Sequence, residues 1–134
     1  MVETLTDKPS VDIGIGSLIK EHRAIIRLKI SEDAKLDKND IEELFKRAPQ
    51  LTQGQPYCLL TDARVNLYAT KEAREFAAEN LLRNNVIANA ILTNSVAVRL
   101  LTNLYIKFNK PEVRTQMFNS ENAAFEWLKS IVKV

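Results

Sequence analysis

The side chains most able to do chemistry are few in this chain and stand apart. His22 is the only histidine and lies between Glu21 and Arg23, while Cys58 is the only cysteine. Catalysis by either residue would need converging partners, and Cys58 sits in an apolar run, where a thiol is usually a small inert hydrophobe. We expect neither to be needed for function. The sequence therefore predicts no catalytic residue and a protein that is not an enzyme.

Cofactor and metal sites also lack their usual patterns. Gly14-Ile15-Gly16 has neither the third glycine nor the following helix of a dinucleotide-binding turn. The acidic residues show no metal-ligand spacing with histidine or cysteine. One cysteine permits no internal disulfide and no cluster held by cysteines alone. We expect no cofactor and no bound metal.

Asp62 is the most interesting carboxylate. It follows the apolar run at 57–61, which is typical of a buried strand, and Arg64 lies close by. Ligands of open α/β sheets bind at the carboxyl ends of the strands, so Asp62 and Arg64 are candidates for a ligand or interaction surface. The alternative is a loop carboxylate that accepts hydrogen bonds from nearby backbone amides.

A helix predicted for residues 95–108 carries a second candidate surface. Arg99, Asn103 and Lys107 are spaced by four along it and form a stripe that could meet an anionic partner, or simply a solvated face. Leucines and aromatics cover more of this helix than one sheet face should bury. We therefore expect the helix to contribute to self-association, with a C2 homodimer as the state.

The elements that must position these residues follow the order ββαβαβαβα. Periodicity and turn residues predict a hairpin with a turn at 21–23, a helix over 37–48 that Pro49 ends, and later strand–helix alternation. Crossovers of this length imply an α/β fold with a mostly parallel central sheet and helices packed over it. The predicted strands are 13–19, 24–30, 57–61, 86–92 and 115–118, and the later helices are 70–83, 95–108 and 120–132.

Composition narrows the class of protein. The 134 residues suffice for one domain, and 19 basic against 17 acidic residues are too balanced to indicate a nucleic-acid partner or an anionic membrane. No apolar stretch is long enough to span a membrane. The amino end does not have the pattern of a signal peptide, so we expect a cytoplasmic protein. Residues 1–11 are polar and predict a flexible arm.

Four segments carry a resemblance to a known family. PYCLLTD at 56–62, TKEAR at 70–74, LYIKFNKP at 104–111 and AAFEWL at 123–128 resemble a bacterial subgroup related to STAS domains and to the CRAL-TRIO lipid-carrier fold. STAS-like domains include anti-sigma-factor antagonists and the cytoplasmic domains of sulfate transporters. The resemblance implies a single STAS-like domain over 12–134 that is a non-catalytic regulatory or interaction module. The alternative is a binding protein for a small apolar or anionic ligand, held between the sheet and helix 95–108.

Thr70 stands where the resemblance places a regulatory switch. Anti-sigma-factor antagonists carry a phosphorylatable serine at the start of this helix, but here the turn reads Ala69-Thr70-Lys71-Glu72, and neither Lys71 nor Glu72 accepts a phosphate in that chemistry. Threonine is also a favourable N-cap, because its hydroxyl accepts from an amide two or three residues on. We therefore expect Thr70 to be a structural cap and not a phosphosite.

Overall fold

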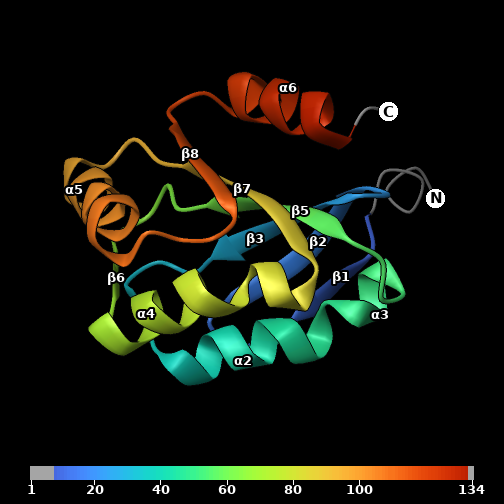
Figure 1. Ribbon diagram of the computed structural model, residues 1–134, viewed down its shortest axis with the longest axis horizontal. Helices are drawn as coiled ribbons and strands as arrows, with labels where there is room; N and C mark the ends of the chain where they lie inside the picture. The colour runs from blue at the N-terminus through green and yellow to red at the C-terminus, as the bar shows by residue number, and fades with distance from the viewer. Residues whose placement is uncertain (1–7, 133–134) are drawn as a thin grey trace.

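Six strands form one central sheet, and helices cover both of its faces (Figure 1). The computed structural model describes residues 8–132. The strand order is β1-β2-β3-β5-β7-β8; the first three strands pair antiparallel, and the pairs β3–β5, β5–β7 and β7–β8 are parallel. The predicted α/β class is confirmed. The strands are β1 Ser10–Asp12, β2 Gly16–His22, β3 Ile25–Ile30, β5 Tyr57–Asp62, β7 Val86–Leu92 and β8 Arg114–Phe118.

The helices begin at residues suited to capping. Asp37 closes a capping box with Asp40 at the start of α2, and Ser95 Oγ accepts from the Val98 amide at the start of α5. The first predicted helix does end before Pro49, but Pro49 then opens a further short helix. The bounds are α2 Lys38–Arg47, α3 Pro49–Thr52, α4 Lys71–Asn80, η1 Leu82–Asn84, α5 Val96–Leu104, the π-helical η2 Tyr105–Asn109, and α6 Glu121–Val132.

Three details differ from the expectations. β4 (Ala34–Leu36) and β6 (Leu67–Ala69) form a parallel two-stranded sheet that was not predicted. β2 continues to His22, so the hairpin turn comes after the predicted position. β1 lies partly within the range expected to be a flexible arm, since Ser10 pairs with Ile19, while residues 1–7 of that arm lie outside the described residues.

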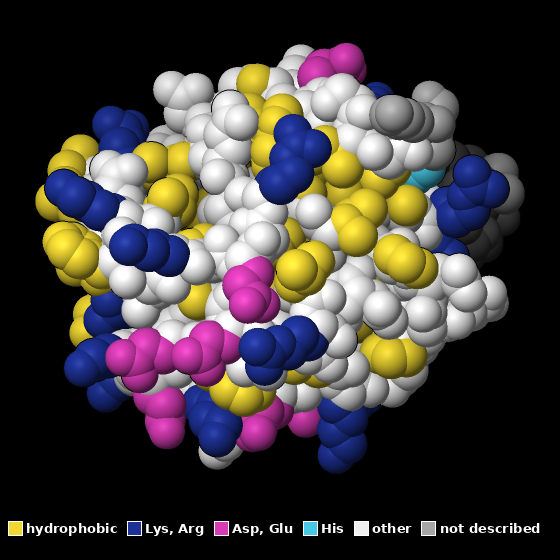
Figure 2. Space-filling view, viewed as in Figure 1, with side chains coloured by type: hydrophobic (Ala, Val, Ile, Leu, Met, Phe, Trp, Pro, Cys, Tyr) yellow, Lys and Arg dark blue, Asp and Glu magenta, His cyan; other side chains and the backbone are white. Residues whose placement is uncertain are grey.

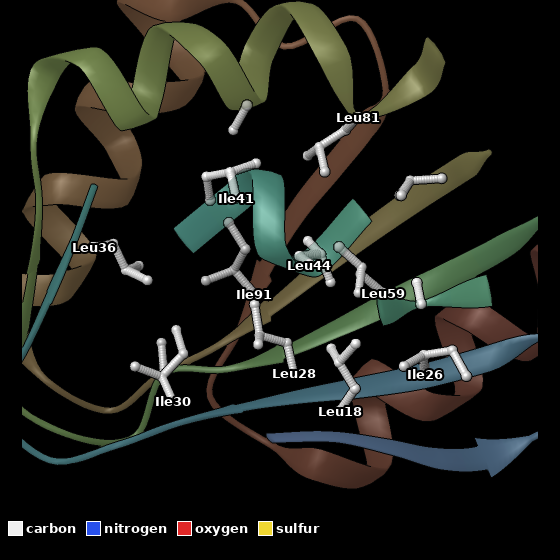
Figure 3. Close-up of a cluster of buried hydrophobic side chains, with 14 of the residues drawn as sticks. Leu18, Ile26, Leu28, Ile30, Leu36, Ile41, Leu44, Leu59, Leu81 and Ile91 are labelled. Atoms are coloured by element: carbon white, nitrogen blue, oxygen red, sulfur yellow. The ribbon is translucent and has the colours of Figure 1, made fainter. Parts of the chain in front are cut away.

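The larger core fills the space between the sheet and helices α2, α4 and α5. Leucines and isoleucines from the inner strands meet those of the helices there, and most are almost fully buried (Figure 3). The labelled side chains of this cluster are Leu18, Ile26, Leu28, Ile30, Leu36, Ile41, Leu44, Leu59, Leu81 and Ile91. Burial of this set is the main favourable term for this face of the sheet.

The second face of the sheet is covered by α6 alone among the described helices (Figure 1). Ala124 and Leu128 of α6 are fully buried against the strands. The strand residues of this cluster are Ile25, Cys58, Leu60, Ala88, Ala90 and Leu92. Because α6 covers this face, Arg27, which alternates with the apolar residues of β3, is only 8% exposed.

Candidate functional site

Asp62, at the end of β5, belongs to an ion-pair network whose inner members, Asp62, Arg27 and Glu21, are buried. Arg27 Nη1 donates to Asp62 Oδ2 at 2.8 Å, across from the neighbouring strand β3. Arg64 binds both oxygens of the same carboxylate, through Nε at 2.9 Å and Nη2 at 2.8 Å. Such two-pronged guanidinium–carboxylate pairs are the stronger kind of hydrogen bond. The structure thus brings Asp62 and Arg64 together, as their spacing suggested.

The network also includes side chains from early in the chain, before β3, and from α6, the last described helix. Arg27 Nε donates to Glu21 at 2.6 Å, and Glu21 is also paired with Lys8. Glu121, in the first turn of α6, accepts from Arg27 at 3.3 Å and from Arg64 at 3.1 Å. Three basic and three acidic side chains therefore balance one another. The charges of Asp62 and Arg64 are used within the protein, which favours a structural role over capture of an anionic ligand.

The pKa values within this network favour the charged forms. Burial opposes ionisation of Asp62, but hydrogen bonds and charges from Arg64 and Arg27 outweigh it and lower the Asp62 pKa. Burial also opposes ionisation of Glu21, yet Lys8 and Arg27 hold the Glu21 pKa below its usual value. In the same way, Glu21 and Glu121 raise the pKa of the partly desolvated Arg27. All three groups are charged at neutral pH.

Sequence reasoning missed four members of this network: Lys8, Glu21, Arg27 and Glu121. Strand alternation separates Arg27 from the apolar side chains of β3, but no local signal shows that α6 covers the face on which Arg27 lies. Glu121 has a detectable local signal, since an acidic residue after the Ser120 cap favours a helix start, but nothing in the sequence links it to Arg64. Glu21 was assigned to a turn, and the structure extends β2 through it.

Thr70 caps α4 as predicted. The amide of Ala73 donates to Thr70 Oγ1 at 3.1 Å. The Thr70 hydroxyl in turn lies 3.1 Å from Oδ1 of Asp37, the cap of α2, and donates to it. The first bond closes the first turn of α4, and the second ties the amino ends of α2 and α4 together. They support the structural interpretation of this residue.

We expect Thr70→Ala to lower the free energy of unfolding by about 1 kcal/mol, as loss of an N-cap does. Denaturant unfolding of both proteins measures this, and partner binding should be unchanged. Phosphopeptide mapping of the protein from its native cells provides the second measurement. Substantial phosphate at Thr70, together with altered binding by Thr70→Glu, would overturn the structural role.

The outer face of α5 is a separate surface. Arg99, Asn103 and Lys107 are all exposed along it, as predicted for the stripe. Beside them runs a row of exposed apolar side chains at a spacing of four. The exposed fraction of each residue in that row lies between 39% and 69%. The row consists of Val96, Leu100, Leu104 and Phe108. Figure 2 shows hydrophobic and basic side chains gathered together over α5, at the left of the view.

Beneath the same helix lies an apolar cavity of about 120 Å³. The inner side of α5 contributes Val98, Leu101 and Thr102, and the sheet contributes residues of β3, β5 and β7. Several side chains labelled in Figure 3 line it, among them Leu28, Ile41 and Ile91. Helix α5 therefore has a cavity on one side and an exposed apolar row on the other.

Neither His22 nor Cys58 has catalytic surroundings. His22 Nδ1 accepts from the Ala24 amide at 3.2 Å in the hairpin turn. Burial raises the pKa of the Cys58 thiol to about 11, away from a reactive thiolate. Between residues 8 and 132 no group of three or more histidine, cysteine or acidic residues is placed to hold a metal ion.

The three candidate surfaces are separate. Within the described part of the chain, no hydrogen bond or ion pair joins the Asp62 network, the Thr70 cap and the α5 stripe.

A family model described as a domain of unknown function, DUF7793, matches residues 18–132. The chain belongs to this family. A search of curated proteins found no match.

The DUF7793 match contains all three surfaces, including every member of the ion-pair network except Lys8. Among solved structures, the DUF7793 fold is similar to an uncharacterised protein of the DUF3478 family, with a SpoIIAA-like fold, from Shewanella loihica PV-4. The TM-score is 0.54 at 16% identity, and the match covers 90% of this chain and 91% of that one. It confirms the resemblance to the STAS-like fold.

Proposed function

We propose that this chain is a non-catalytic interaction module of the bacterial cytoplasm, and that it binds a protein partner through the outer face of α5. The observation that carries the proposal is the exposed row of Val96, Leu100, Leu104 and Phe108. No helix between residues 8 and 132 is long and apolar enough to cross a membrane.

The spacing of the row suits a helical or grooved partner. Residues four apart form a continuous ridge on a helix, and such ridges pack into the grooves of a second helix. Contiguous apolar surface of this kind on a soluble domain marks interaction sites. The inner face of α5 is already packed against the domain, so the row itself is free for a partner.

Charge indicates what the partner carries. Arg99, Lys107 and Lys110 are the only ionisable side chains besides Tyr105 between residues 95 and 110, and none is acidic. We infer a partner with an apolar ridge flanked by acidic residues. The C2 homodimer predicted from the sequence would bring Arg99 of one copy toward Lys107 of the other in an antiparallel pairing. Like charges there disfavour a second copy.

The test is site-specific photocrosslinking in the native cells. A photoreactive residue at position 100 is expected to capture one protein, mapped to a segment with acidic flanks. The same group at Leu82, an exposed leucine on η1, should not capture it. Arg99→Glu with Lys107→Glu should abolish the crosslink, and purified complexes should weaken as salt rises.

Two results would contradict this partner. A dimer in light scattering that Leu100→Asp dissolves would identify a second copy as the occupant. Flotation of the purified protein with anionic vesicles, lost in Lys107→Glu, would identify a membrane surface, since basic apolar helices also bind there. A crosslinked segment without acidic residues would contradict the charge argument alone.

The cavity beneath α5 favours a second candidate function, the binding of a small molecule. The sequence predicted this alternative at the same place, between the sheet and helix 95–108. A void of about 120 Å³ in an otherwise packed core supports it. The charges of Asp62 and Arg64 are already paired with each other, so an apolar ligand is favoured over the anionic one that the sequence left open.

A further inference from the structure

The cavity exists because small side chains stand where larger ones would fill the space. Ala73 and Ala77 of α4 face it, and Ala63 and Ala69 line it beside β5 and β6. The opposite wall consists of large aliphatic residues such as Leu28, shown in Figure 3. Protein interiors leave few voids larger than a water molecule, so a void of about 120 Å³ is a distinct feature of this core.

The size of the cavity limits the ligand. An engineered apolar cavity of about 150 Å³ in another protein stays dry and binds benzene. The cavity here, at about 120 Å³, is slightly smaller and similarly lined by aliphatic side chains. A molecule with a single six-membered ring is therefore the appropriate size.

Two polar groups on the lining have hydrogen-bonding capacity to spare. Tyr105 is 8% exposed, and its hydroxyl has no hydrogen-bond partner among the described residues. Asn89 is 5% exposed, and its Oδ1 accepts from the Thr61 hydroxyl at 2.7 Å, which leaves the NH₂ group as a donor. A buried donor without a partner destabilises the protein, so a ligand that accepts a hydrogen bond from it gains affinity.

The charged residue on the lining is already engaged. Arg74 lines the cavity, and its Nε donates to the backbone oxygen of Ala69 at 3.3 Å. No acidic side chain lines the cavity within the described residues. A neutral ligand fits this lining better than an ion, because an unpaired charge is costly in an apolar site.

We propose that the cavity binds a neutral molecule with one hydrocarbon ring and one oxygen, and that this oxygen accepts a hydrogen bond from Tyr105, with the Asn89 amide as the second donor. The inference rests on the second proposed function, small-molecule binding, and is independent of docking at the outer face of α5. Tyr105 belongs to η2, the π-helical turn that follows α5. Such turns occur frequently at functional sites.

The test uses two probes of similar shape, cyclohexanone and methylcyclohexane; in the second, a methyl group takes the place of the carbonyl oxygen. Methyl NMR titration of the full chain should shift Leu28, Ile91 and Val98 with both probes. Tyr105→Phe is expected to weaken cyclohexanone binding about fivefold to tenfold and to leave methylcyclohexane unchanged, because a net hydrogen bond is worth about 1 kcal/mol.

Two alanine substitutions locate the site. Ala77→Leu should fill the cavity and abolish binding of both probes, whereas Ala123→Leu, on the exposed side of α6, should leave it intact. If Ala77→Leu does not fold, the proposal is still tested by the methyl shifts and by the ratio of cyclohexanone affinities between the original protein and Tyr105→Phe. If Tyr105→Phe binds cyclohexanone as tightly as the original protein does, recognition by Tyr105 is overturned, whereas small-molecule binding still stands. If neither probe shifts the lining methyls, both proposals fail.

Discussion

Replacing Arg27 by alanine is expected to lower the free energy of unfolding by about 3–5 kcal/mol, the usual cost of breaking a buried ion pair from one side. The guanidinium contacts Asp62, Glu21 and Glu121, and its removal leaves the first two carboxylates poorly compensated in a buried site. Its stacking over the Phe125 ring, at 5.7 Å, is lost as well. Urea unfolding monitored by circular dichroism measures the change.

Arg64→Ala is the matched control. Arg64 pairs with the same Asp62, but its side chain is 39% exposed against 10% for Arg27. We expect it to cost about 1 kcal/mol or less, as solvent-exposed pairs do. Equal losses in the two variants would show that burial does not set the strength of this network.

The pH dependence of stability gives an independent check on the ionic character of the network. The pKa values of Asp62 and Glu21 are lowered in the folded state, so the unfolded chain binds more protons as the pH falls. The contribution of these two carboxylates to the free energy of unfolding is fully present above about pH 5. It is lost as the pH falls through their pKa values in the folded state. Arg27→Ala should flatten this acid limb. An unchanged slope would point to packing instead of charge.

A second large effect is expected at Gly16. A Cβ built there would lie 2.1 Å from the backbone oxygen of Lys29 and 3.1 Å from the Cα of Ile30, on the strand paired with β2. Backbone atoms cannot move aside as a flexible side chain does. Gly16→Ala should therefore cost about 3 kcal/mol or more, at the upper end of overpacking, measured by thermal unfolding.

Gly54→Ala provides the comparison for Gly16. Gly54 has a φ of +79° and open space where a Cβ would be. Only the conformational cost applies there, about 1 kcal/mol for alanine in the left-handed region. A Gly16→Ala protein as stable as Gly54→Ala would mean that the β2–β3 hairpin opens to accept the methyl group.

Elements with strong local signals were predicted well. The run at 86–92 is apolar except for Asn89 and is bounded by polar residues, and it is strand β7 with the same limits. The cap at Thr70 marked the start of α4 correctly, and the helix expected from residue 95 begins at Val96. β4 and β6 were missed because three-residue strands are too short to show a period, and their pairing joins segments about 30 residues apart.

The candidate site was less accessible to sequence reasoning for a different physical reason. Asp62 was singled out by its position at a strand end, and the exposed stripe on α5 followed from helical spacing. Arg27 was not recognised as part of the site because alternation along a strand distinguishes its two faces but does not show what covers each one. The cavity depends on the alanines of α4 facing Leu28 across the core, which is a tertiary arrangement without a local pattern.

The position of α6 has a consequence for how the protein is made. This helix covers the second sheet face, yet it follows all six strands in chain order. During synthesis every strand leaves the ribosome before the helix does, so this apolar face stays open to chaperones until α6 docks. Cys58 lies on that face and is fully buried once α6 is in place. Protection of this thiol from a labelling reagent would therefore time the last step of folding on a translating ribosome.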